Sequence, residues 1–207
     1  MCGIYGRLER DGHIARTAYD QLAVSRLTHR GPDDEGMWYG GRCIIGMRRL
    51  SVIDLVSGHQ PMASPDGQIC VVFNGEIYNF MEVRRELESH GRRFATHSDT
   101  EVIVHGYQQW GESVFDRLNG MFAVAIWDEP ASSLLLVRDR LGVKPLYYFE
   151  DATRLIFASE IKSILAHPDV RREVEPKGLL NYFAYGDRKS TRLNSSHVSE
   201  SRMPSSA

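Results

Sequence analysis

Short runs of apolar, β-branched and aromatic residues alternate with polar segments along most of the chain. Six of these runs predict β-strands, at residues 44–47, 69–73, 121–127, 134–138, 146–149 and 154–158. The polar segments that separate the later runs, 128–133 and 150–153, have the length of hairpin turns. Because strands joined by short turns pair antiparallel, the pattern predicts antiparallel sheet.

Apolar residues at helical spacing follow three polar signals. In a capping box, a polar N-cap residue is followed three positions later by Glu or Gln, and Asn79 with Glu82 and Ser98 with Glu101 fit this pattern. Glycines at positions 91 and 111 are expected to end these two helices. Strands interleaved with a few helices favour an α+β fold over a parallel βαβ sheet. An earlier helix is expected to carry Tyr19, Ala23 and Leu27 on one face.

Composition and charge exclude several classes of protein. The 207 residues include 42% apolar and 25% charged residues, as in an ordinary globular domain. A formal net charge of −2 argues against broad nucleic-acid binding and against adhesion to an anionic membrane. No apolar stretch approaches the about 18 residues of a membrane span, and charged residues interrupt the N-terminus where a secretory signal would be apolar. We therefore expect a cytoplasmic protein.

The three cysteines, Cys2, Cys43 and Cys70, are widely spaced and odd in number. This pattern fits neither a disulfide framework nor a zinc site, and the histidines show no metal-ligand spacing. The sequence therefore predicts no metal site and a reducing compartment.

The composition divides the chain into two parts. Residues 1–186 are expected to form one continuous domain. Residues 187–207 are rich in serine and show no apolar periodicity, which predicts either a disordered tail or a segment foreign to the domain. The abrupt change of composition favours the foreign segment.

Cys2 is a candidate nucleophile because removal of Met1 would leave a thiol and a free α-amine on the same residue. The amine, with a reference pKa of about 7.7–8.0, can accept the thiol proton near neutral pH. The following Gly3 would let the backbone approach a substrate. The alternative is a chance cysteine that is buried and inert.

Three further segments carry candidate chemistry. Asn74 and Gly75 follow the strand predicted at 69–73, and a strand-to-helix turn there would present amide donors to an oxyanion, although an Asn-Gly turn without a chemical role is an alternative. Arg49 offers a planar fork for a carboxylate, or is a surface cation. Asp99 could hold an ammonium group, or cap a helix. The segment 29–34 (HRGPDD) is a turn signal without a derived role.

Taken together and in order, six motifs resemble the glutaminase domain of glutamine-hydrolysing asparagine synthetases. The resemblance covers residues 2–186, and the motifs are residues 2–4 (CGI), 29–33 (HRGPD), 49–54 (RLSVID), 74–79 (NGEIYN), 98–101 (SDTE) and 138–148 (RDRLGVKPLYY). It implies the N-terminal-nucleophile hydrolase fold, a four-layer αββα sandwich with two antiparallel sheets.

The resemblance also implies a mechanism and a set of site residues. Cys2 would attack the side-chain amide of L-glutamine, and Asn74 and Gly75 would stabilise the oxyanion. Arg49 would bind the substrate α-carboxylate and Asp99 its α-ammonium. The remainder of the pocket would be formed by Leu50, Val52 and Glu76.

The chain departs from the family in one large respect. Members continue into a C-terminal synthetase domain that binds ATP and Mg²⁺, and nothing in residues 1–207 matches its pyrophosphate-binding loop. We therefore expect no cofactor in this chain, with the missing synthetase domain as its partner and a homodimer in the full-length protein. A helix near the break, Pro176–Tyr185, is expected to expose apolar surface that the missing domain would cover.

Two alternatives remain open from the sequence. One is the glutaminase domain of another class II amidotransferase, such as a phosphoribosyl-pyrophosphate or fructose-6-phosphate enzyme, which shares the opening Cys-Gly-Ile. The motifs 74–79 and 138–148 favour the asparagine-synthetase type over these enzymes. The other is a non-catalytic remnant, or a truncated chain that folds poorly. The expected catalytic positions are all filled, which argues against a degenerate remnant.

Overall fold

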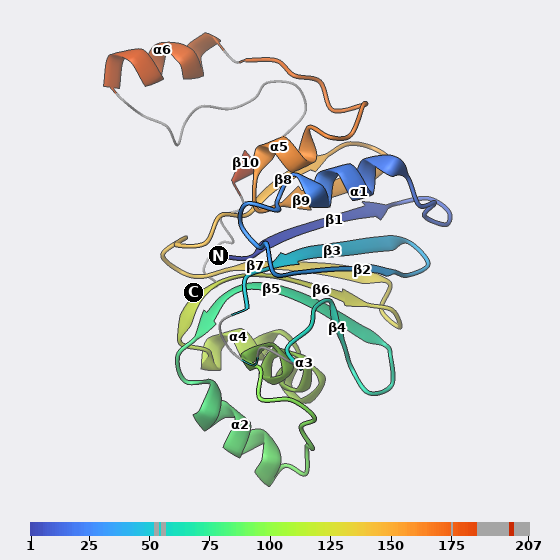
Figure 1. Ribbon diagram of the computed structural model, residues 1–207, viewed down its shortest axis with the longest axis vertical. Coiled ribbons are helices and arrows are strands. Elements are labelled where there is room, and N and C mark those ends of the chain that lie inside the picture. Colours follow the sequence, from blue (N-terminus) through green and yellow to red (C-terminus); the bar gives the residue numbers. More distant parts are fainter. Residues whose placement is uncertain (52–53, 55–56, 175, 186–198, 201–207) are drawn as a thin grey trace.

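The computed structural model describes residues 1–51, 54, 57–174, 176–185 and 199–200. Two antiparallel sheets pack face to face, and helices cover the outer face of each (Figure 1). The first sheet has the strand order β10-β8-β9-β1-β3-β2 and the second β4-β5-β6-β7. The predicted α+β sandwich with two antiparallel sheets is therefore present in the described residues.

The strands of the first sheet are β1 (Gly3–Glu9), β2 (Asp34–Tyr39), β3 (Cys43–Arg49), β8 (Tyr147–Glu150), β9 (Arg154–Ala158) and β10 (Ser199–Glu200). Those of the second are β4 (Met62–Ala63), β5 (Ile69–Ile77), β6 (Gly120–Asp128) and β7 (Ser133–Arg138). The helices are α1 (Ala18–Ser25), α2 (Phe80–Ser89), α3 (Asp99–Trp110), a 3₁₀ turn at Gly111–Ser113, α4 (Val114–Arg117), α5 (Ile161–Ile164) and α6 (Pro176–Tyr185).

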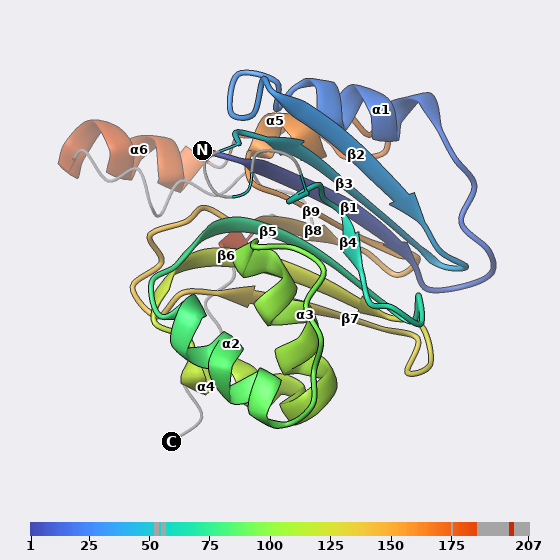
Figure 2. The same cartoon turned by 60° about the horizontal axis from the view of Figure 1, so that its bottom comes forward.

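Apolar side chains fill three spaces between the four layers. One cluster lies between the first sheet and α1 with α5, one between the two sheets, and one between the second sheet and α2 with α3. Figure 2 shows α3 lying across the second sheet. Strand β5 faces two of these clusters, because Val71 and Phe73 point to the helices while Cys70 and Val72 point to the other sheet. Burial on both faces explains why β5 is apolar without interruption.

All six predicted strands are present, but the sequence patterns missed β1, β2 and β4. Strand β1 was hidden by its glycines and charged residues. Gly6 is required there because a Cβ at this position would lie 2.3 Å from the Phe157 ring. Arg7 is buried beside Asp20 and so counts as an inward-facing position despite its charge.

Both predicted capping boxes are wrong in detail. The Asn79 side chain makes no cap to α2; it binds the Arg117 carbonyl and the Asn119 N–H instead. Ser98 does cap α3 by accepting from the Thr100 N–H. Glu101, however, does not complete the box and accepts from the N–H groups at residues 95 and 96. Tertiary partners therefore outcompeted the local pattern.

The other predicted elements have mixed outcomes. Gly91 and Gly111 follow α2 and α3 as expected, with φ of 84° and 60°. On α1 Ala23 is buried, and so is Leu27 just beyond it, but Tyr19 is 43% exposed. Of the predicted tail, 187–207, only Ser199–Glu200 lie within the described residues. None of the described helices is both long and apolar enough to cross a membrane.

A buried ion pair fastens α1 to the first sheet. The Asp20 carboxylate accepts from Arg7 Nε and Nη2, both at 3.0 Å, and from the Tyr5 hydroxyl at 2.8 Å. Burial acts to raise the pKa of Asp20, but hydrogen bonds from Arg7 and Thr17 outweigh it and lower the pKa overall. The ionised carboxylate is thus the form that the fold stabilises.

Replacement of this carboxylate is expected to destabilise the fold. The Asp20→Asn variant should lose about 3–5 kcal/mol in free energy of unfolding at pH 7, because Arg7 would keep a buried charge without its main partner. Since the pKa of Asp20 is lowered on folding, its contribution is present above the unfolded pKa of about 3.9 and is lost in more acidic solution. Urea denaturation at pH 7 and pH 3 should show this, with exposed Asp11→Asn as the unaffected control; an equal deficit at both values would contradict it.

Candidate active site

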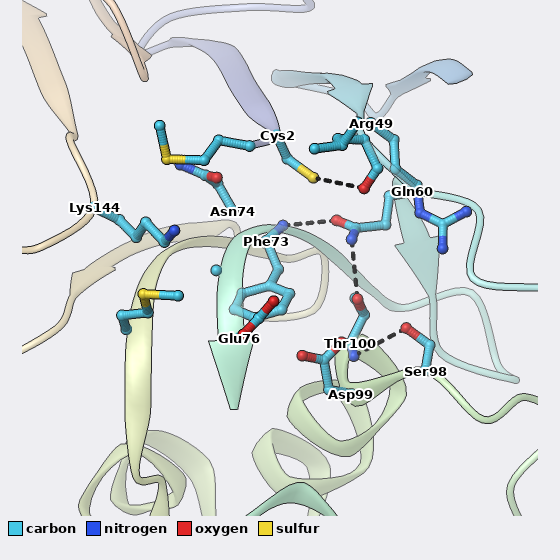
Figure 3. Close-up of a pocket in the computed structure, with 14 residues that line it drawn as sticks. Cys2, Arg49, Gln60, Phe73, Asn74, Glu76, Ser98, Asp99, Thr100 and Lys144 are labelled. Carbon is cyan, nitrogen blue, oxygen red and sulfur yellow. Dashed lines mark hydrogen bonds between the residues drawn. The ribbon is translucent and has the colours of Figure 1, made fainter. Parts of the chain in front are cut away.

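A pocket of about 190 Å³ opens where β1 begins, between the edge of β5 and the first turn of α3 (Figure 3). It brings together segments that lie up to 98 positions apart in the sequence. Seven of the eight predicted site residues line it, and the eighth, Val52, falls outside the described residues. The seven are Cys2, Arg49, Leu50, Asn74, Gly75, Glu76 and Asp99.

Cys2 stands directly before β1, and its thiol faces the pocket. The Sγ atom lies 3.6 Å from the Leu50 carbonyl oxygen, to which the thiol donates. Burial raises the pKa of the thiol, while the Leu50 contact, the N-terminal amine and Arg49 act to lower it. With Met1 attached, the thiol of Cys2 is therefore held mainly in its protonated form.

The segment 29–33, for which the sequence gave no role, holds the backbone around Cys2. Arg30 donates from Nε to the Cys2 carbonyl oxygen at 2.8 Å and pairs with Glu160. Gly31 lies against β3, and a Cβ there would come within 2.4 Å of the backbone of Arg48 and Arg49. The motif therefore fixes the nucleophile's main chain rather than forming an ordinary surface turn.

Asn74 and Gly75 lie inside β5, so the predicted strand-to-helix turn at these residues is wrong. The Asn74 side chain is 1% exposed, and neither its Oδ1 nor its Nδ2 has a hydrogen-bond partner among the described residues. Buried amides are nearly always paired, and leaving one unpaired costs about 1–3 kcal/mol. Figure 3 shows this side chain at the same end of the pocket as Cys2. The amide is thus arranged to meet a ligand.

Gly75 is the only residue type that this register permits. A Cβ at this position would lie 2.1 Å from the Met121 carbonyl oxygen and 2.7 Å from the Phe122 Cα. Alternate residues of a strand direct their N–H groups to the same edge. The Phe73 and Ile77 N–H groups meet side chains at the pocket edge of β5, so the Gly75 N–H faces the same edge.

Asp99 is the first residue of α3 and is 5% exposed. Its Oδ2 accepts from the Ile77 N–H at 3.2 Å. Burial raises the pKa of Asp99 to about 6, and nearby Glu76 adds to the rise. A buried carboxyl in this state is suited to receive a cationic group, because a positive partner would restore its ionised form.

Arg49 ends β3 and reaches across the loop that follows it. Its Nη2 donates to the Asp54 carbonyl oxygen at 2.7 Å, and the residue is 6% exposed. A cation is therefore held at the opposite wall from Asn74, next to the exposed Leu50. Cation and carboxylate walls together fit a zwitterionic amino acid.

The pocket also contains residues that the sequence patterns missed, chiefly Gln60, Thr100 and Lys144, all less than a tenth exposed. Lys144 and Thr100 lie inside motifs of the family resemblance, which is the signal that could have identified them. Gln60 lies in none of the six motifs. No group of three His, Cys, Asp or Glu residues in the described part of the chain is placed to hold a metal ion.

Comparisons with known proteins agree with this geometry. The family model described as a glutamine amidotransferase domain matches residues 1–203. The Bacillus subtilis asparagine synthetase (glutamine-hydrolyzing) 3 is 40% identical over 194 residues, which cover 92% of this chain and 31% of the relative. Asparagine synthetase 2 of the same organism is 43% identical over 189 residues, covering 87% and 24%. The chain thus spans less than a third of the length of these relatives.

Solved structures resemble the fold. The glutamine phosphoribosylpyrophosphate amidotransferase from B. subtilis, in complex with ADP and GMP, superposes with a TM-score of 0.67 at 22% identity, covering 80% of this chain and 43% of that one. This likeness confirms the predicted N-terminal-nucleophile sandwich. At this level of identity it concerns the fold alone.

Proposed function

The chain belongs to the glutamine amidotransferase domain family, and from this premise we propose that it hydrolyses the side-chain amide of L-glutamine, with Cys2 as the nucleophile. The observation that carries the proposal is the buried, unpaired amide of Asn74 at the Cys2 end of the pocket. Such an amide is costly in the folded protein and useful only when a ligand oxygen or nitrogen meets it.

The nucleophile becomes active when Met1 is removed. The α-amine of Cys2 then takes the thiol proton, and the thiolate attacks the δ-carbon of glutamine. The Asn74 Nδ2 and the Gly75 N–H stabilise the oxyanion of the tetrahedral intermediate. Its collapse expels ammonia, which takes a proton from the α-ammonium, and leaves a thioester on Cys2. Water hydrolyses the thioester to give glutamate and the free thiol.

The two ends of the pocket hold the amino-acid part of the substrate. Arg49 binds the α-carboxylate and Asp99 the α-ammonium, while the backbone at Leu50 and Val52 together with Glu76 completes the site. No cofactor takes part in these steps. The substrate must therefore carry both a free α-amine and a free α-carboxylate.

We assign the released ammonia to an ATP- and Mg²⁺-dependent asparagine synthetase domain, as in the relatives that are more than three times longer than the matched region. Helix α6 supports this partner. It stands apart from the four layers (Figures 1 and 2), with Leu180 66% and Phe183 76% exposed. Apolar side chains this exposed are typical of a surface that another domain covers.

Glutamate release tests the proposed function. The protein, checked by mass for loss of Met1, should form glutamate and ammonia in equal amounts from L-glutamine. L-Asparagine, which places its amide one methylene closer to the α-carbon, and N-acetyl-L-glutamine, which lacks the cationic end, should react at least about 100-fold more slowly. No glutamate from a folded protein that has lost Met1 would overturn the proposal.

The pH dependence should report Asp99. Because the pKa of this carboxyl is raised to about 6, kcat/KM for glutamine is expected to fall as the pH is lowered through 6, where the carboxylate that holds the ammonium becomes protonated. The Asp99→Asn variant should raise KM and lose this acidic limb. The rise due to the α-amine, near its reference pKa of about 7.7–8.0, should remain in both proteins.

The exposed Asp116 offers a control for this measurement, since Asp116→Asn removes a carboxylate outside the pocket. Its profile should match that of the unmodified protein. An acidic limb that persists unchanged in Asp99→Asn would assign the titration to another group.

A further inference from the structure

The side-chain amide of Gln60 links two walls of the pocket. Gln60 is 5% exposed and lies one residue before Pro61, where the chain turns into the edge strand β4. Its Oε1 accepts from the Phe73 N–H at 2.7 Å, and its Nε2 donates to Thr100 Oγ1 at 3.0 Å (Figure 3). One amide thus joins β5 to the first turn of α3.

Each of these two contacts adjoins a residue of the proposed chemistry. Phe73 directly precedes Asn74, and Thr100 directly follows Asp99. The Gly75 N–H lies on the same edge of β5, between the Phe73 N–H held by Gln60 and the Ile77 N–H held by Asp99. The donors for the oxyanion are therefore anchored from both sides, once by Gln60 and once by Asp99.

The Gln60 backbone is itself fixed from behind. A Cβ on Gly36 would lie 2.0 Å from the Gln60 carbonyl oxygen, so the loop rests directly on β2 without an intervening side chain. On the side of β5, β4 ends its pairing at Met62 opposite Val71. The Gln60 amide then continues this edge in place of a strand. Among uncharged side chains of its length, only glutamine offers both a donor and an acceptor.

We propose that Gln60 is a positioning residue, which sets the spacing between the oxyanion donors on β5 and the ammonium-binding carboxylate on α3. This inference rests on the proposed function. Glutamine spans the two walls, because its δ-carbonyl meets Asn74 and Gly75 while its α-ammonium meets Asp99. A misplacement of about 1 Å between such groups can lower the rate by about 100-fold. Gln60 acts through both walls and need not touch the substrate.

A double-mutant cycle tests the bridge. Gln60→Met keeps the length of the side chain and removes both hydrogen bonds, whereas Thr100→Val is isosteric and removes only the contact with α3. We expect kcat/KM for glutamine to fall by about 10–100-fold in Gln60→Met and about tenfold in Thr100→Val. The double variant should be within about twofold of Gln60→Met, because residues that act as a unit are not additive. Gln68→Met, at an exposed glutamine, is the matched control.

Alkylation of Cys2 by chloroacetamide, located by mass spectrometry, separates positioning from loss of structure. Cys43 and Cys70 are buried and should remain unlabelled. The alkylation rate should stay within about twofold of the unmodified protein in every variant, since this reaction does not need the spacing between the walls. Parallel losses of alkylation and hydrolysis would overturn the inference in favour of a structural role.

The failure of the inference and that of the proposed function can be told apart. If the unmodified protein hydrolyses glutamine and both Gln60→Met and Thr100→Val match it, Gln60 has no positioning role and the proposed function stands. If Gln60→Met does not fold, Thr100→Val alone decides, because it retains the Gln60–Phe73 bond. An unmodified protein without hydrolysis overturns the proposed function, and the positioning role with it.

Discussion

A single residue left in front of Cys2 is expected to abolish glutamine hydrolysis. Attachment of any residue converts the α-amine into an amide and removes the base that would accept the thiol proton. Burial raises the pKa of this thiol, and the hydrogen bond that the structure records for Sγ goes to the Leu50 carbonyl oxygen, which cannot accept a proton. General-base catalysis contributes about 10²–10⁴-fold, so the rate should fall by about 1,000-fold or more.

Two versions of the chain make the comparison. Both carry the same N-terminal extension; protease cleavage leaves Cys2 first in one and Gly-Cys2 in the other. A glycine is smaller than the Met1 side chain, with which the pocket remains open, so a steric block cannot explain its effect. Only the version that begins with Cys2 should release glutamate, and its Cys2→Ala variant should release none. Equal rates for the two versions would exclude the α-amine as the base.

The chemistry of the site was more predictable than its geometry. Cys2, Arg49, Asn74 and Asp99 were found from their residue types and from a family resemblance, and they do meet in one pocket. What brings them together is the packing of one sheet on the other, and local patterns carry no information about that. Gln60 was missed for the same reason, because its partners are 13 and 40 positions away.

The error at Asn74 and Gly75 shows how tertiary structure overrides a turn signal. Asn-Gly is typical of turns, but β5 continues through this pair to Ile77 because β6 lies against it. The close approach needs glycine on both strands, since a Cβ on Gly75 would lie 2.1 Å from the Met121 oxygen and one on Gly120 2.2 Å from the Glu76 oxygen. The same glycine therefore allows the strand to continue and leaves an N–H at the pocket edge.

Replacement of Asn74 is expected to separate activity from stability. The Asn74→Leu variant should lose about 10²–10³-fold in kcat, which is the usual effect of removing one oxyanion donor. KM should change little, because the donor acts on the charge that develops in the transition state. The free energy of unfolding should be unchanged or higher, because an amide without partners is replaced by an apolar group of similar size.

The paired Asn79 provides the matched control. Its side chain accepts from the Asn119 N–H at 2.9 Å and donates to the Arg117 carbonyl at 2.9 Å, so Asn79→Leu should lower stability by about 1–3 kcal/mol while leaving kcat close to that of the unmodified protein. Opposite responses of the two asparagines would mean that the fold retains the Asn74 amide for the reaction. If Asn74→Leu were destabilised like Asn79→Leu and kept its kcat, the amide would be part of the scaffold and the oxyanion would need another donor.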